Sequence, residues 1–270
     1  MKKILLLSTL IFALSSCEEV IELELDTTEQ RIVVESNLDA THGICKVSLS
    51  KTGDFYASNS FEKIPGASIL LNTPSGGETS LIEMSPGVYS AENLQVSAGD
   101  AVSLSIVLPG GERIDVSNVI APAPVSLDSL LIVKSMGGAG PGGQAGGSTD
   151  QYSLTAEWKD ALGSSDFYRL KIYQNSVFQS GTYILTDDRL GDGEPISRPV
   201  IRQTFDLGDT LHCQLLAVNK GYYDYFTDLA NGDGRGYSSP APFNPKGNFS
   251  GGVLGYFGVW YVSEKTIIVN

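Results

Sequence analysis

The sequence predicts an all-β protein with two β-sandwich domains, and three observations lead to this prediction. Short runs rich in Val, Ile, Leu and Thr alternate with polar residues along most of the chain. Turn residues separate these runs at the spacing that is typical of sandwich strands. Glycine is frequent, with 30 of 270 residues, and the chain is long enough for two hydrophobic cores. Only residues 221–231 have the apolar spacing of a helix.

Residues 1–16 have the layout of a secretory signal peptide. A basic start precedes an apolar run, and small residues then lead to Cys17. The run is shorter than the roughly 20 apolar residues that a membrane-spanning helix needs. The cysteine at this place resembles the lipidation site of bacterial lipoproteins, which implies that acylated Cys17 anchors the mature chain in outer-membrane lipid. The alternative is an ordinary cleaved signal that releases a periplasmic protein.

Residues 17–30 are expected to form an acidic tether. Glu18 and Glu19 follow Cys17 directly, and acidic residues at this place resemble the export signal of Bacteroidota surface lipoproteins. This resemblance implies an outer-membrane protein that faces the cell exterior, with a solvated tether as the alternative. The formal net charge of −13 excludes nucleic acid as a partner, because phosphates require a basic surface.

The N-terminal sandwich is expected to span residues 31–120. Its strands are expected at residues 31–37, 43–51, 66–72, 79–84, 88–92, 101–108 and 112–120. Glycine-containing turns separate several of these runs. The order of residues 66–69, 85–91 and 98–104 resembles a prealbumin-like or immunoglobulin-like sandwich.

A Pro-rich linker at residues 121–126 is predicted to lead into the C-terminal sandwich of residues 127–270. Trp158, followed by Tyr168 and Tyr173 on the next strand, resembles the core of a fibronectin type III sandwich. The glycine-rich residues 136–149 are expected to form a disordered loop, because they cannot bury enough apolar surface to offset their ordering entropy. The strands of this half are expected at residues 127–134, 152–160, 166–174, 177–188, 200–207, 210–219 and 253–270, the last with a turn near Ser263 and Glu264.

The predicted helix at residues 221–231 also carries the densest group of aromatic residues. Apolar side chains recur at helical spacing from Tyr222 to Leu229, and Gly232 is well placed to end the helix. Tyr223 falls off this apolar face. Such aromatic residues either stack on a ligand or partner, or fill the core. The candidate contact residues are Tyr222, Tyr223, Tyr225 and Trp260.

A calcium site is the candidate cofactor site of the chain. Four carboxylates cluster around a glycine turn, and calcium takes six to eight oxygen ligands from such loops. A solvated turn is the alternative, since Asp and Gly favour turns for backbone reasons. Residues 231–234 are a weaker candidate. The expected ligands at the first site are Asp187, Asp188, Asp192 and Glu194.

The sequence does not predict an enzyme. Its two histidines, His42 and His212, lie in distant segments and suggest no Ser/His/Asp set. Cys45 and Cys213 lack the close spacing of a metal site and are expected to be buried free thiols, with a disulfide as the alternative. Carboxylates are plentiful, so a carboxylate-dependent glycan hydrolase stays open as a third interpretation.

Several segments, in order, resemble one known family. They are residues 17–23, 31–35, 47–53, 65–69, 166–170, 186–193, 220–225 and 248–257. Together they are similar to the domain-of-unknown-function family 4249 (DUF4249) of Bacteroidota lipoproteins. The resemblance implies a non-catalytic surface lipoprotein that acts as an accessory or ligand-binding partner of a TonB-dependent receptor. A structural or adhesive surface protein without a transport role is the alternative.

Overall fold

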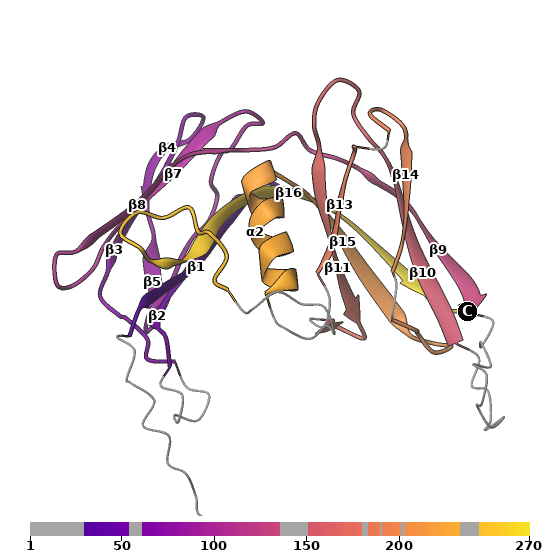
Figure 1. Cartoon of the computed structure of the whole chain (residues 1–270), viewed down its shortest axis with the longest axis horizontal. Helices are drawn as coiled ribbons and strands as arrows, with labels where there is room; N and C mark the ends of the chain where they lie inside the picture. The colour runs from indigo at the N-terminus through magenta and orange to yellow at the C-terminus, as the bar shows by residue number, and fades with distance from the viewer. Residues whose placement is uncertain are drawn as a thin grey trace, which may run out of the picture.

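The computed structural model describes residues 30–53, 61–135, 151–179, 183–189, 191–200, 203–232 and 243–270. Residues 1–16, the lipidation and export residues Cys17, Glu18 and Glu19, and the predicted loop 136–149 lie outside these ranges. The described chain is all-β apart from one helix, which confirms the predicted fold class (Figure 1). None of its helices has the length and apolar character needed to cross a membrane.

The strands form three sheets (Figure 1). The four-stranded sheet has the order β4-β3-β7-β8 and consists of β3 (Ser68–Thr73), β4 (Gly77–Ser80), β7 (Ala101–Val107) and β8 (Arg113–Ile120). The three-stranded sheet has the order β14-β10-β9 and consists of β9 (Leu127–Ser135), β10 (Gln151–Lys159) and β14 (Pro195–Pro199).

The nine-stranded sheet, here called the large sheet, runs through the whole molecule. Its order is β12-β11-β15-β16-β1-β2-β6-β5, and β13 also pairs with β11. Its strands are β1 (Ile32–Asp39), β2 (Ile44–Lys51), β5 (Ile82–Ser85), β6 (Val88–Ala91), β11 (Phe167–Gln174), β12 (Val177–Phe178), β13 (Ile184–Asp187), β15 (Thr210–Val218) and β16 (Leu254–Ile268).

Strand β16 joins the two halves of the chain. It pairs in parallel with β1 and antiparallel with β15, and Figure 1 shows it in yellow passing behind the helix. The predicted turn near Ser263 and Glu264 was wrong, because these residues pair with Leu215 and Gln214 of β15 and the strand continues for 15 residues. The domain limits at residues 31–120, 121–126 and 127–270 stay predictions.

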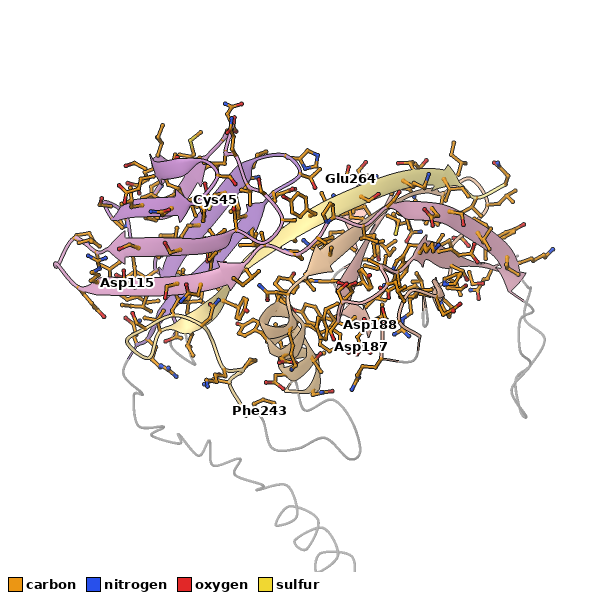
Figure 2. All side chains as sticks on the ribbon, turned by 90° about the horizontal axis from the view of Figure 1, so that it is seen from above. Cys45, Asp115, Asp187, Asp188, Phe243 and Glu264 are labelled. Atoms are coloured by element: carbon orange, nitrogen blue, oxygen red, sulfur yellow. The ribbon has the colours of Figure 1, made fainter. Side chains whose placement is uncertain are left out.

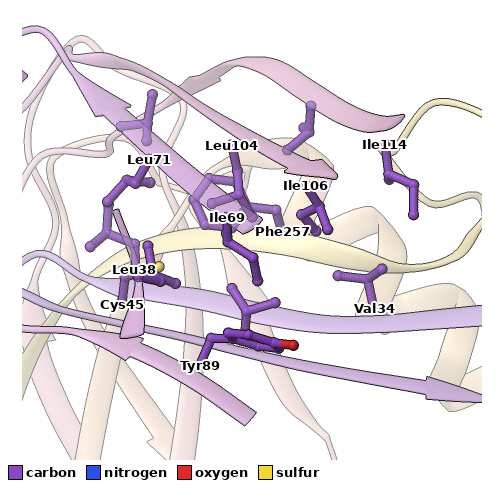
Figure 3. Close-up of a cluster of buried hydrophobic side chains, with 14 of the residues drawn as sticks. Val34, Leu38, Cys45, Ile69, Leu71, Tyr89, Leu104, Ile106, Ile114 and Phe257 are labelled. Atoms are coloured by element: carbon purple, nitrogen blue, oxygen red, sulfur yellow. The ribbon is translucent and has the colours of Figure 1, made fainter. Parts of the chain in front are cut away.

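Two hydrophobic cores lie against one face of the large sheet. The first core fills the space to the four-stranded sheet (Figure 3), and the second fills the space to the three-stranded sheet. Phe257 and Val259 of β16 enter the first core, whereas Ile267 packs against the second. These residues are separated by even numbers of positions along the strand, so their side chains lie on the same face. The two sandwiches therefore share a single sheet.

The helix α2 (Lys220–Asn231) covers the opposite face of the large sheet, and its bounds confirm the predicted helix. Trp260 and Val262 of β16 pack there with Tyr222 of the helix. The Asn219 side chain caps the first turn by accepting a hydrogen bond from the Tyr222 backbone N–H at 2.8 Å. Gly232 ends the helix, and its N–H donates to the Asp228 carbonyl at 2.8 Å.

Three predicted strands differ from the structure. The run at 79–84 is divided between β4 and β5 because Leu81 is buried where the chain crosses between sheets. The run at 177–188 contains two short strands, β12 and β13, instead of one. The run at 200–207 contributes only a bridge at Phe205 in the described residues, and β14 precedes it. Prolines at both ends of β14 are tolerated because it is an edge strand.

The two described cysteines are free and buried, as predicted. Cys45 belongs to the first core and Cys213 to the second, so the two sulfurs cannot meet. Burial raises the pKa of each thiol to about 12, which keeps both thiols protonated at neutral pH.

Candidate functional site

A cavity of about 500 Å³ lies between helix α2 and the large sheet. We call it the α2 cavity, and it is lined by β1, β11, β16, α2, Phe178, Tyr183 and residues 244–245. Its volume falls within the range of roughly 300–1,000 Å³ found for small-molecule sites. Three of the predicted contact residues, Tyr222, Tyr225 and Trp260, line it together.

Aromatic rings form much of the wall of the α2 cavity. Tyr222, Tyr225 and Phe226 reach it from α2, because positions i, i+3 and i+4 share one face of a helix. Tyr256 and Trp260 reach it from β16, where residues an even number of steps apart share one face. The Tyr222 ring centroid lies 4.4 Å from that of Phe226 and 5.8 Å from that of Trp260. The helix and the sheet thus hold these rings in fixed positions.

Two cations of β11, Arg169 and Lys171, also line the α2 cavity. The Arg169 side chain is buried, with 7% of the residue exposed, and its guanidinium carbon lies 4.2 Å from the Phe226 ring centroid. Its Nη1 donates a hydrogen bond to the Tyr222 hydroxyl at 2.5 Å, whereas its Nε has no partner among the described residues. Lys171 Nζ lies 4.7 Å from the Trp260 ring centroid. Both cations therefore lie among rings.

The electrostatics of the α2 cavity follow from burial. Burial, together with the nearby Arg169 charge, lowers the pKa of Lys171 to about 8. Burial also raises the pKa of Tyr256 to about 12 and raises the pKa of Tyr222, although Arg169 opposes the shift of Tyr222. The tyrosines stay neutral at pH 7, so Arg169 and Lys171 supply the positive charge of the cavity.

Sequence reasoning missed Arg169 and Lys171. The signal in the sequence is an alternation, in which these two cations are interleaved with Tyr168, Leu170 and Ile172. All three of these residues are buried. Such a pattern is equally typical of a half-solvated strand face, and only the helix packed on that face distinguishes the two cases. Tyr223, the fourth predicted contact residue, instead lines a second cavity of about 570 Å³ near the start of α2.

The predicted calcium ligands are only partly brought together. Asp188 and Asp192 form a group with Asp160, in which one carboxylate oxygen from each residue lies within 4.8 Å of the others. Asp160 follows β10 and is distant in sequence from Asp188 and Asp192. This separation explains why the sequence did not predict Asp160 as a ligand. Asp160 and Asp188 are buried. Three carboxylates in this arrangement could hold a hard cation such as calcium.

Asp187 and Glu194 do not join that group. The Asp187 carboxylate pairs with Arg189 at 2.8 Å, and this partner lowers the pKa of Asp187 (Figure 2 labels Asp187 and Asp188). Within the group, the Gly193 N–H donates to Asp160 and the Asp166 N–H donates to Asp188, both at 2.9 Å. The loop itself thus binds these carboxylates, and calcium binding stays a prediction.

The model of a domain of unknown function, DUF4249, matches residues 18–266. The chain belongs to the DUF4249 family. This match confirms the family resemblance found in the sequence. No curated protein sequence matches the DUF4249 chain significantly.

Three solved structures are similar to this DUF4249 protein at low identity. A two fibronectin type III domain segment from chicken tenascin has 13% identity, covers 70% of this chain and 91% of its own, and gives a TM-score of 0.23. A DUF4785 family protein from Legionella pneumophila has 13% identity, 69% and 52% coverage, and a TM-score of 0.24. The adhesin InvE from Yersinia pseudotuberculosis has 14% identity, 69% and 55% coverage, and a TM-score of 0.20.

The two histidines of the DUF4249 protein have different hydrogen-bond partners. His42 Nδ1 lies 2.8 Å from an Asp39 carboxylate oxygen, and this hydrogen bond raises the pKa of His42. His212 Nδ1 lies 3.1 Å from the Thr266 hydroxyl. Across the ranges that the structure describes, neither histidine is hydrogen-bonded to a serine or a cysteine.

Proposed function

We propose that this DUF4249 protein is a non-catalytic lipoprotein of the outer-membrane surface that binds a small ligand for a TonB-dependent transporter. The observation that carries the ligand-binding part is the α2 cavity, whose aromatic walls come from both α2 and the large sheet. The non-catalytic part rests on the resemblance of the chain to DUF4249 lipoproteins.

The α2 cavity is suited to binding because its walls are fixed before a ligand arrives. Tyr222 is buried, and the Tyr256 hydroxyl lies 3.4 Å from the Asn219 side-chain oxygen. Rings that are already ordered lose little conformational entropy when a ligand stacks on them. A preformed aromatic cavity therefore favours a binding protein over a purely structural one.

The membrane part of the proposal rests on the sequence. Cys17 would carry the lipid, since stable anchoring takes two or more acyl chains at about 0.8 kcal/mol per buried CH₂. Glu18 and Glu19 would direct the protein to the outer leaflet. The transporter role rests on the resemblance of the chain to DUF4249 lipoproteins. The wild-type chain is then a surface-exposed partner of a membrane receptor.

Two experiments on cells test this location. Cys17→Ser is expected to release the protein from membranes, whereas a Glu18→Gln/Glu19→Gln double variant keeps the lipid but becomes protected from proteinase added to whole cells. Thr27→Ser, a conservative change further along the tether, serves as the control. Complete protection of the wild-type chain would contradict surface display.

Affinity purification of the full chain from detergent-solubilised outer membranes tests the transporter role. We expect a TonB-dependent receptor to co-purify in stoichiometric amounts. Its reproducible absence would favour the structural or adhesive alternative. Release of sugar from surface glycans by the purified chain would instead favour the carboxylate-dependent hydrolase.

A further inference from the structure

We infer that the α2 cavity takes a ligand with an oxyanion, a carboxylate or a phosphate, on a flat apolar body, and that Arg169 and Lys171 bind this oxyanion. The inference rests on the proposed ligand-binding function and names the class of ligand. It is carried by the placement of two cations inside a cavity whose wall holds several aromatic rings together with aliphatic and polar residues, among them Glu35.

Arg169 lines the α2 cavity and keeps a buried donor without a partner among the described residues. The residue is more than nine-tenths buried, and only one edge of its guanidinium is bound, through Nη1 to the Tyr222 hydroxyl. Its Nε has no partner among the described residues. A buried donor without an acceptor is costly, and a guanidinium edge matches two oxygens of a carboxylate or phosphate. An oxyanion in the α2 cavity would give the Arg169 guanidinium an acceptor of opposite charge.

Lys171 adds a second positive charge on the same face of β11. Residues i and i+2 of a strand lie about 7 Å apart, so both groups can approach one anion. The Lys171 ammonium lies over Trp260 and is half-buried. Burial is the main cause of the lowered Lys171 pKa, and repulsion by the neighbouring Arg169 charge adds to it. A bound anion would relieve this repulsion.

Two surface arginines of the chain have acidic partners, whereas this pair has none among the described residues. Arg113 binds Asp115 at 2.9 Å and Arg189 binds Asp187 at 2.8 Å, both at the surface. In the part of the chain that the structure describes, Arg169 forms no ion pair with a carboxylate, and neither does Lys171. The nearest carboxylates are Glu35 in the cavity wall and Asp39 of β1, and neither forms an ion pair with Arg169 or Lys171. An external anion could therefore pair with the two cations.

The rings of the α2 cavity specify the rest of the ligand. Trp260, Tyr225 and Tyr256 offer apolar faces beside the two cations. Offset stacking or edge contacts with such rings favour a flat ligand body over a branched one. A cavity of about 500 Å³ accommodates a ligand of one or two rings.

The test uses the full chain purified in detergent and measures binding by calorimetry. The probes are acetate, inorganic phosphate, 4-hydroxyphenylacetate and phenyl phosphate, with tyrosol as a neutral match and tyramine as a cationic match. We expect a ring-bearing anion to bind at least about tenfold more tightly than tyrosol and tyramine. The carboxylate and phosphate members of the panel show which oxyanion is preferred.

Variants assign the binding to the two cations. Arg169→Gln is expected to weaken the best anion about tenfold or more, and Lys171→Gln to weaken it severalfold. Arg169→Lys keeps the charge but loses the planar fork, so an intermediate affinity is expected. Lys265→Gln, at an exposed position of β16, is the control and should bind as the wild type does. Circular dichroism checks the fold of each variant.

Three results would overturn the inference: no anion of the panel binds, tyrosol binds as tightly as the anions, or Lys171→Gln and a folded Arg169→Gln bind as the wild type does. If Arg169→Gln does not fold, Lys171→Gln decides. Equal binding of tyrosol would still leave a ligand-binding protein. Failure of the proposed transporter role is seen separately, in the co-purification of the receptor.

Discussion

The pKa of Lys171 reflects the environment of the α2 cavity, because burial disfavours the charged form of its side chain. The groups that face it are Arg169 on its own strand, Asp39 on β1 and the Trp260 ring on β16. Arg169 lowers the pKa of Lys171 and Asp39 raises it, and burial outweighs both in setting a value of about 8. The folded protein therefore binds fewer protons at this site than the unfolded chain between about pH 8 and the ordinary lysine pKa of about 10.4.

This difference predicts a pH-dependent contribution to stability. Since the unfolded chain binds the additional proton, the contribution of Lys171 to the free energy of unfolding rises as pH increases above 8. Between pH 7.5 and 9.5, the wild type should gain on the order of 1 kcal/mol relative to Lys171→Met, measured by urea unfolding. Taking the difference between the two proteins cancels the contribution of the tyrosines and thiols, which also titrate at high pH. Parallel pH profiles for the two proteins would contradict the prediction.

At the scale of single elements, the N-cap of α2 holds the aromatic wall of the α2 cavity in place. The Asn219 side-chain oxygen accepts from the Tyr222 N–H, and its Nδ2 donates to the Ile120 carbonyl at 3.3 Å. Asn219→Ala should lower the free energy of unfolding by about 1–2 kcal/mol, measured in urea, and weaken binding of the best anion. Asn219→Asp keeps the cap acceptor and should retain most of the stability. Equal losses for both variants would show that the cap is not the cause.

The local pattern of polar and apolar residues predicted most elements well. Four elements lie close to their expected positions, namely β1, β7, β8 and α2. In each of them, the burial of side chains follows the period of a strand or a helix. The pattern failed where the chain changes sheet inside one apolar run, as at Leu81. Alternation marks which side chains are buried, and it does not show against which sheet they pack.

At the scale of the whole molecule, the parallel pairing of β1 with β16 connects segments more than 200 residues apart. Gly255 lies at φ 116° next to Val34, and a Cβ there would overlap the Val34 carbonyl oxygen. Gly255→Ala should therefore destabilise the protein by about 3 kcal/mol or more, measured by urea unfolding. Gly110→Ala, where a Cβ meets open space, is the control and should change stability by less than about 1 kcal/mol. Similar values for both variants would show that the close approach is unimportant.

Because β16 contributes to both sandwiches, the two cores should unfold together. Cys45 reports on the first core and Cys213 on the second, and both are buried. A thiol reagent should label neither cysteine in the native protein, as measured by mass spectrometry of peptides. As urea is added, the labelling of both cysteines should rise with the same midpoint. Two separate midpoints would show that each sandwich unfolds independently.

The sequence alone determined the all-β class, the helix, the free thiols and the family, because these depend on local period, composition and motif order. It placed Tyr222, Tyr225 and Trp260 among the contact candidates, since aromatic density is visible without a fold. Only the tertiary structure decided that β16 is shared, that Asp160 joins Asp188 and Asp192, and that two cations of β11 enter the α2 cavity. These features depend on strands that are distant in the chain becoming neighbours, and no local pattern encodes which pairs will meet.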